Sequence, residues 1–253
     1  MTSVQVGESL FFLLSAYTHS YSSLFTALRI RPTTSADLAS IPARFQRTVI
    51  HATTPTIVSV DAISASPAAS GSATALSSPA TPGKKQVFTF DQVHSPNTTQ
   101  HALFTSTAQP LISRFLEGFN CTILAYGQTS SGKTFTMTGI DLDANPSDPN
   151  NGVGIIPRAV STIFSQAKKL KDERGGSWNY SIKGSFIEVY NEDLIDLLSS
   201  DEATGARREV QIREGKDGSI IWGGLREVNV RNSNEVMKYV VIGTPMPSRA
   251  RTD

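Results

Sequence analysis

The stretch that most constrains this chain is GQTSSGKT at residues 127–134, which directly follows the apolar run CTILAY. The pattern GxxxxGK[ST] carries meaning only between a strand and the start of a helix, and both neighbours have the composition for it. In that setting the backbone N–H groups of the turn face an anion. We therefore predict a phosphate-binding turn, with Lys133 reaching the β and γ phosphates of a nucleotide and the Thr134 hydroxyl binding Mg²⁺.

Every residue of this turn is a candidate nucleotide contact: Gly127, Gln128, Thr129, Ser130, Ser131, Gly132, Lys133 and Thr134. The competing interpretation is a glycine turn that merely starts a helix. The run CTILAY is continuous rather than alternating in polarity, which predicts a strand buried on both faces. Cys121, the single cysteine, lies in this run and is expected to be a small buried hydrophobe, which argues against a disulfide scaffold.

Composition excludes several classes of protein. The 253 residues are 39% hydrophobic with a formal net charge of +1, which gives a sizeable core and no overall basic surface for nucleic acid. No apolar run is long enough to cross a membrane. The short apolar block at residues 10–14 lacks preceding basic residues, so it does not resemble a secretory signal.

The remaining chain alternates strand and helix signals, which predicts an α/β fold. ALRIRP (27–32), residues 55–60 and QVFTFDQV (86–93) favour strands, while about 62–85 is a low-complexity loop of Ser, Ala, Pro and Thr. Residues 98–118 favour a helix that is capped by Thr98 or Thr99, interrupted at Pro110 and ended at Gly118. GIIPRAVSTIF opens a second helix, and SFIEVYNEDLIDLL passes from a strand into an acidic segment.

These motifs together resemble the kinesin motor domain. AYGQTSSGKTFTMTG, ALRIRP, FTFDQV, GIIPRAV, SFIEVYNE and QIREGKDGSIIWGGLREVNV occur in the family's order and at compatible spacing, from about residue 27 to the end of the chain. The resemblance implies a P-loop NTPase fold with a mostly β central sheet flanked by helices. It implies ATP and Mg²⁺ as ligands, microtubules as partner and a microtubule-stimulated ATPase activity. The sequences of the segments LRIRP and QIREGKDGSI are similar to those of kinesin-4 type motors, some of which associate with chromosomes.

The resemblance also assigns contacts to the base. Arg29, Arg31 and Pro32 match the RxRP element that lies against adenine in kinesins, and Phe135 matches the ring position that stacks on the base. The alternatives are that the two arginines are solvated charges on an edge strand and that Phe135 belongs to the core. For Tyr190, Asn191 and Glu192 we expect a structural role.

The family's later motifs are missing from these 253 residues. Neither an NxxSSRSH-like switch I nor a DxxGxE-like switch II is present, and the chain reaches SRARTD (248–253) where switch I would begin. No catalytic residue is therefore assigned, and the chain is expected to bind nucleotide poorly and hydrolyse little. Since the missing strands lie inside the kinesin sheet, CTILAY is expected to lack neighbours on either side and the fold to be incomplete.

The N-terminal region departs from the family in another way. Kinesins of this type would read SVQVALRIRP, but residues 7–26 stand between MTSVQV and ALRIRP. Gly-Glu-Ser and Thr-Ala can be encoded with splice-site sequences, so we predict that residues 7–26 are translated intron that packs poorly and spoils the strand. A genuine N-terminal extension is the alternative. The predicted domains are thus 1–26 and a partial motor domain at 27–253.

Two other functions remain open. One is a P-loop NTPase that is not a motor, which would need a Walker B acid after an apolar strand, and no clear candidate follows the turn. The other is a nucleotide-binding fragment without catalysis. The motor interpretation implies the cytoplasm and microtubules as location, the spindle or nucleus for a kinesin-4 type, and dimerisation through a stalk outside these residues.

Overall fold

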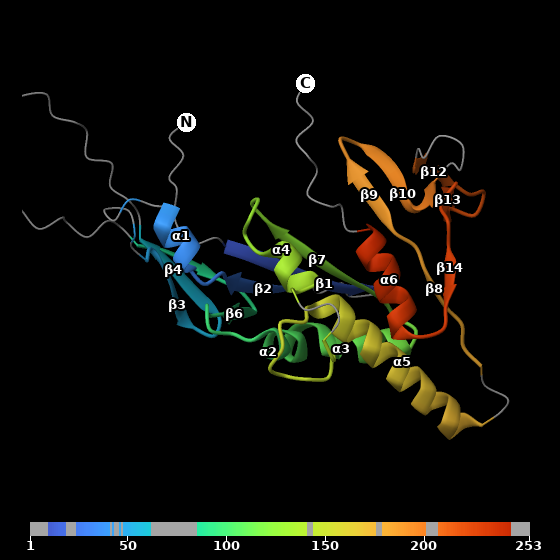
Figure 1. Ribbon diagram of the computed structural model, residues 1–253, viewed down its shortest axis with the longest axis horizontal. Coiled ribbons are helices and arrows are strands. Elements are labelled where there is room, and N and C mark those ends of the chain that lie inside the picture. Colours follow the sequence, from blue (N-terminus) through green and yellow to red (C-terminus); the bar gives the residue numbers. More distant parts are fainter. Residues whose placement is uncertain are drawn as a thin grey trace, which may run out of the picture. The chain divides into compact units, whose positions relative to one another are not determined.

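The computed structural model describes residues 10–18, 24–40, 42, 46, 48–61, 85–140, 144–175, 179–200 and 207–243 (Figure 1). The predicted low-complexity loop, apart from Lys85, and the segment SRARTD lie outside the described residues. The chain divides into two compact units, Met1–Arg158 and Ala159–Asp253. Each unit is described by itself below.

The first unit is built on a four-stranded sheet in the order β6-β2-β1-β7. Its strands are β1 (Leu10–Thr18), β2 (Phe25–Ile30), β6 (Gln92–His94) and β7 (Asn120–Gly127). β2 and β6 run parallel, whereas β1 is antiparallel to both β2 and β7. The alternating residues of ALRIRP and the continuous apolar run CTILAY therefore form strands as predicted, and Ile30 ends β2 two residues before Pro32.

β1 lies within the segment predicted to be translated intron. Its residues pair with β2 from Leu10↔Ile30 to Ser15↔Phe25, and with β7 from Phe11↔Gly127 to Thr18↔Asn120. The expectation that residues 7–26 spoil the strand they interrupt is wrong for ALRIRP, because β2 forms over its apolar residues, while MTSVQV lies outside the described residues. The expectation that CTILAY lacks neighbours on either side is wrong for one edge, since β1 pairs with β7 along its whole length. β7 is the last strand of the sheet, and no described strand pairs with its other edge.

A second sheet of three strands contributes Ile50 and Val58 to the core of this unit. β3 (Ile50–Thr54), β4 (Ile57–Asp61) and β5 (Lys85–Thr89) pair in that order, all antiparallel. The predicted strand at 55–60 thus begins later, because Pro55 and Thr56 form the turn between β3 and β4. The core of the unit contains Leu28, Ile30, Val49, Ile50 and Val58, with Val60, Phe90 and Val93 packed against it.

The helical segment after β6 is divided into three parts, as Pro110 predicts. α2 (Gln100–Leu103) is capped by the Thr99 hydroxyl, which accepts from the Ala102 N–H at 3.1 Å. A π-helical turn, η2 (Phe104–Ala108), connects it to α3 (Gln109–Leu116), where Pro110 occupies the first turn. Gly118 follows the end of α3 with φ of +100°, a conformation that favours glycine. Both predicted helix boundaries are confirmed.

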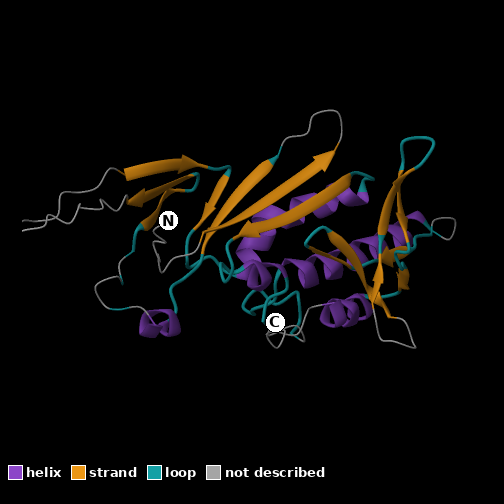
Figure 2. Cartoon of the chain, turned by 90° about the horizontal axis from the view of Figure 1, so that it is seen from above, coloured by secondary structure: helices purple, strands orange, loops and turns teal. Residues whose placement is uncertain are grey.

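β7 is covered on one face only by the described residues. α3 and α4 (Lys133–Met137) contact it (Figure 2), yet Leu124 and Tyr126 are 53% and 65% exposed. The prediction of burial on both faces is therefore wrong, because the opposite face of β7 has no described element packed on it. Cys121 is partly buried rather than fully buried, its thiol lies 3.4 Å from the Leu111 carbonyl oxygen, and burial raises its pKa.

The second unit contains α5 (Ile155–Arg174), which begins just before the division, and three small antiparallel sheets. β8 (Ile182–Gly184) pairs with β14 (Val228–Val230). β9 (Ile187–Tyr190), β10 (Asp193–Ser200) and β11 (Arg207–Glu209) form the second sheet. β12 (Gln211–Glu214) and β13 (Ile220–Gly223) form a hairpin, and α6 (Ser233–Gly243) contacts β10 and β14.

The EVYNED motif forms the turn between β9 and β10. Asn191 and Glu192 have φ of 49° and 73°, and Tyr190 pairs with Asp193 on either side of them. Two central residues with positive φ make a tight hairpin turn whose twist matches the strands. Asn191 and Glu192 therefore shape a hairpin turn, which supports the structural role predicted for Tyr190, Asn191 and Glu192.

Candidate phosphate-binding site

The predicted phosphate-binding turn joins the end of β7 to the start of α4. Ser130 and Gly132 adopt left-handed conformations with φ of 63° and 101°, and the Ser131 N–H donates to the Gln128 carbonyl at 3.2 Å. Ser131 is 2% exposed, and its hydroxyl has no hydrogen-bond partner among the described residues. The turn therefore has the strand, glycine loop and helix start that the motif requires.

Lys133 is the first residue of α4, directly after the glycine of this turn. Its ammonium group donates to the carbonyl oxygens of Gly127 and Gln128, both at 2.8 Å. Since an ammonium has three N–H donors, these two bonds leave one. No carboxylate in the part of the chain that the structure describes forms an ion pair with Lys133. A lysine held at the turn without an acidic partner is suited to an anionic ligand.

Arg31 reaches the same turn from the end of β2. Its guanidinium donates to the Ser130 carbonyl oxygen at 3.1 Å and to both carboxylate oxygens of Asp37 at 2.9 Å. Asp37 belongs to α1 (Ser35–Ser40), where it also accepts from the Thr34 N–H and hydroxyl. These bonds from Thr34, followed by the charge of Arg31, lower the pKa of Asp37, so it is ionised at neutral pH.

Arg29 is a buried residue of β2, which is an inner strand of its sheet. It is 7% exposed, and its guanidinium donates to Gln100 Oε1 at 2.7 Å and to the Thr136 hydroxyl at 2.8 Å. Burial lowers the pKa of Arg29 to about 10, which leaves it charged at neutral pH. The guanidinium also lies 5.1 Å from the centre of the Phe135 ring. Arg29 therefore holds α2 and α4 together, and it is no solvated charge.

The other predicted contacts are accessible. Pro32, Gln128, Thr129, Thr134 and Phe135 are all exposed, and Phe135 at 36% has one ring contact with Arg29. The Thr134 hydroxyl offers a single hard oxygen ligand. No group of three or more metal-binding side chains occurs in the described ranges.

Gln100 and Arg158 were not predicted from the sequence. Gln100 is buried and donates to the Phe135 carbonyl oxygen at 2.5 Å, so it links Arg29 to α4. Arg158, in the first turn of α5, donates to the carbonyl oxygens of Val153, Pro146 and Asp148 and to Asn151 Oδ1. It therefore ties down residues 144–153. The signal that could have found both is a polar side chain at an apolar position of a helix.

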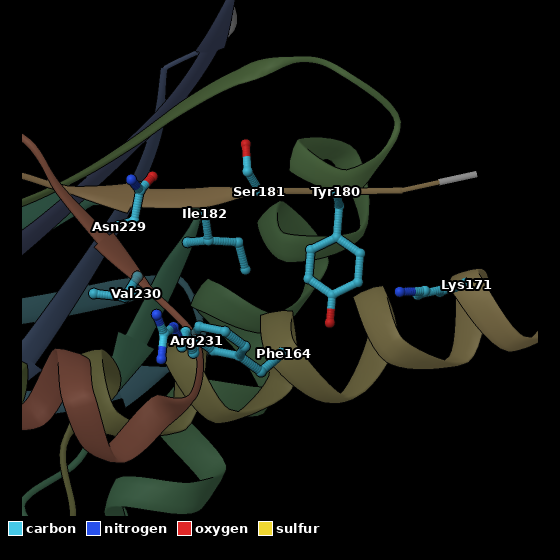
Figure 3. A pocket seen from close by; sticks show the side chains of 8 residues that line it. All are labelled: Phe164, Lys171, Tyr180, Ser181, Ile182, Asn229, Val230 and Arg231. Carbon is cyan, nitrogen blue, oxygen red and sulfur yellow. The ribbon is translucent and has the colours of Figure 1, made fainter. Parts of the chain in front are cut away.

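A hollow of about 340 Å³ lies in the second unit, between α5 and the β8–β14 pair (Figure 3). Its lining consists of Phe164, Lys171, Tyr180, Ser181, Ile182, Asn229, Val230 and Arg231. The polar side chains are exposed at its rim, whereas Val230 is buried at its base. None of these residues belongs to the predicted phosphate-binding turn.

Among the described helices, none has the length and apolar composition needed to cross a membrane.

The sequence is similar to those of kinesin motor proteins. A family model described as "Kinesin motor domain" matches residues 29–253. Kinesin-like protein KIN-5C of Nicotiana tabacum is 35% identical over 176 residues, which cover 66% of this chain and 17% of the relative. Chromosome-associated kinesin KIF4 of Gallus gallus is 34% identical over 170 residues, covering 67% and 13%.

The fold is similar to the solved structure of a fast kinesin. The TM-score is 0.60 at 26% sequence identity, and the similarity covers 86% of this chain and 51% of that one. The chain therefore spans about half of that structure and less than a fifth of these relatives. The predicted fold class, a P-loop NTPase of the kinesin motor type, is confirmed.

Proposed function

Because the chain belongs to the kinesin motor family, we propose that it is the nucleotide-binding part of a microtubule motor and that it binds ATP with Mg²⁺ at residues 127–134. Kinesin motor domains are ATPases that move on microtubules, which makes the interpretation as a P-loop NTPase other than a motor the weaker one. The proposal concerns what these residues contribute to that activity.

The observation that carries the proposal is the placement of Lys133. Its ammonium lies at the turn, 2.8 Å from two backbone carbonyl oxygens, and has no ion-pair partner among the described residues. Hydrogen bonds between a charged donor and phosphate are stronger than those to a neutral carbonyl. A triphosphate would therefore compete well for Lys133 against Gly127 and Gln128.

The surroundings of Lys133 support a nucleotide rather than phosphate alone. Thr134 presents an exposed hydroxyl beside it for Mg²⁺, and Phe135 presents part of its ring for the base. Pro32 is exposed at the end of β2. Arg31 is bonded to Asp37 and Ser130, and Arg29 is buried, so the base contact proposed here rests mainly on Phe135 and Pro32.

Calorimetry with MgATP tests the assignment. Replacing Lys133 by Ala removes charge-assisted hydrogen bonds worth about 1.5–3 kcal/mol each, so the affinity should fall at least about tenfold. Lys168→Ala is the matched control, since Lys168 is an exposed lysine on α5, and it should leave the affinity unchanged. Equal affinities for Lys133→Ala and the unchanged chain would refute the assignment.

A second candidate is a nucleotide-binding fragment without catalysis. It is favoured because these 253 residues contain no NxxSSRSH-like or DxxGxE-like segment to sense the γ-phosphate. We expect purified residues 1–253 to show no microtubule-stimulated ATP hydrolysis and no saturable binding to microtubules. A stimulated rate that disappears in Lys133→Ala would contradict this and place catalytic groups inside the chain.

The subfamily and location follow from the motor interpretation. Kinesins act on microtubules in the cytoplasm or the spindle. The kinesin-4 assignment remains a prediction, because the similarity to KIF4, at 34%, and to KIN-5C, at 35%, does not separate the two types. A chromosome-associated or nuclear role, and dimerisation through a stalk, remain predictions of the same kind.

A further inference from the structure

We propose that Arg31 is a positioning residue that holds the phosphate-binding turn in its binding conformation, and that it does so without contacting the base. The inference rests on the proposed nucleotide site and specifies how its shape is controlled. It differs from the sequence expectation, in which Arg31 lies against adenine.

Arg31 spans two anchors with one guanidinium group. One nitrogen donates to the Ser130 carbonyl oxygen at 3.1 Å, and the other donates to both oxygens of Asp37 at 2.9 Å. The two side chains of the ion pair are 28% and 24% exposed. The rigid, planar guanidinium fixes the direction of both bonds at once, which a lysine cannot do.

Asp37 is itself immobilised, so it can serve as the fixed end of this brace. It accepts from the Thr34 N–H at 2.9 Å and the Thr34 hydroxyl at 2.7 Å, while its own N–H donates back to that hydroxyl at 3.2 Å. This reciprocal arrangement is a capping box at the start of α1. Arg31 therefore connects a well-held carboxylate to the phosphate-binding turn.

The other end of the brace is the carbonyl oxygen of Ser130, a residue of the turn with a left-handed conformation. Ser130 has φ of 63°, a conformation that costs about 1 kcal/mol or more for a residue other than glycine. Its carbonyl belongs to the same planar peptide group as the Ser131 N–H, which bonds Gln128. Holding the Ser130 oxygen therefore also orients the Ser131 N–H. Without Arg31, the turn can relax to conformations in which its N–H groups point elsewhere.

A brace and a base contact differ in how they depend on the ligand. Inorganic tripolyphosphate has the phosphates of ATP but no base. If Arg31 shapes the turn, its removal weakens both ligands by the same factor. If Arg31 contacts adenine, its removal weakens ATP alone.

The experiment measures the affinities of Mg-ATP and Mg-tripolyphosphate by calorimetry for the full chain, Arg31→Ala, Arg31→Lys and Asp37→Asn. We expect Arg31→Ala to weaken both ligands by about tenfold, as the loss of one charge-assisted hydrogen bond predicts. Arg31→Lys, which keeps the charge but lacks the fixed geometry of the guanidinium, should recover part of this loss. Asp37→Asn should weaken both ligands by about threefold, again equally.

The outcomes are distinct. A weaker affinity for ATP with an unchanged affinity for tripolyphosphate would overturn the proposal in favour of a base contact. An unchanged affinity for both ligands would also overturn it, and would leave Arg31 only the role of holding α1. If Arg31→Ala fails to fold by circular dichroism, Asp37→Asn decides, because Arg31 itself remains. Failure of the unchanged chain to bind either ligand would instead refute the proposed nucleotide site, and this inference with it.

Discussion

The two ends of α4 connect to segments that arginines hold in opposite ways. Before α4, the phosphate-binding turn receives one backbone hydrogen bond from Arg31, which is partly exposed. After α4, residues 144–153 receive bonds to three carbonyl oxygens from Arg158, which is 2% exposed. The first segment keeps donors for a ligand, while the second is held by several hydrogen bonds from one buried guanidinium.

Gly132, in the phosphate-binding turn, and Gly139, which lies between α4 and residues 144–153, differ in the space around them. A Cβ on Gly132, in the turn, would meet nothing within 4 Å. A Cβ on Gly139, which bridges to Val153, would collide with the Gly152 carbonyl oxygen and lie 2.5 Å from the Gly154 nitrogen. A glycine with positive φ can therefore lie in open space or in close contact with other backbone atoms. Only the surroundings distinguish the two.

The largest expected effect is on stability, from Arg158→Ala. Removing the guanidinium leaves the buried Val153 carbonyl oxygen and the partly buried acceptors in residues 146–151 without this donor, which should lower the free energy of unfolding by about 4 kcal/mol. Arg31→Ala, at a partly exposed ion pair, should cost about 1 kcal/mol or less. Urea denaturation followed by circular dichroism measures both. Similar losses for the two variants would break the comparison.

The next effect comes from the two glycines. Both have positive φ, so an alanine at either position carries backbone strain of about 1 kcal/mol or more. Gly139→Ala adds a collision with backbone and should lose about 3 kcal/mol in total, whereas Gly132→Ala should lose about 1 kcal/mol. The same denaturation measurement gives the difference. A loss from Gly132→Ala equal to that from Gly139→Ala would show that the space around Gly132 is not open.

The smallest effect is on the pH dependence of stability. It comes from His94, the last residue of β6, which pairs with Arg29 of β2. Burial, and secondarily the charge of Arg29, lower the pKa of His94 below its usual 6.5. The folded state therefore binds fewer protons than the unfolded state as pH falls through 6.5. This stabilising contribution is complete above that pH and is lost as pH drops toward the lower, folded pKa.

Denaturation between pH 7.5 and 5 tests this with His94→Asn. The variant should lose less stability than the unchanged chain over that interval. Parallel pH dependences of the two proteins would show that His94 does not contribute.

Several helix boundaries were predictable from the sequence because the signals that set them are local. Thr99 caps α2, Gly118 follows α3 with positive φ, and Pro110 divides the helix, each through bonds or steric limits within a few residues. The phosphate-binding turn was predictable for the same reason. The burial of β7 was not, since an apolar strand has no local sign of whether a second layer covers it.

The sequence by itself determined where the chain turns, which residues begin and end its helices, and that Lys133 and Thr134 follow a glycine loop. Backbone sterics and capping act over a few residues, so a short stretch of sequence contains them. Only the tertiary structure decided that β1 lies between β2 and β7, that Arg29 is buried beside Gln100, and that Arg31 bonds a residue 99 positions away. Such pairings depend on which distant segments meet when apolar surface is buried, and no local pattern specifies that partner.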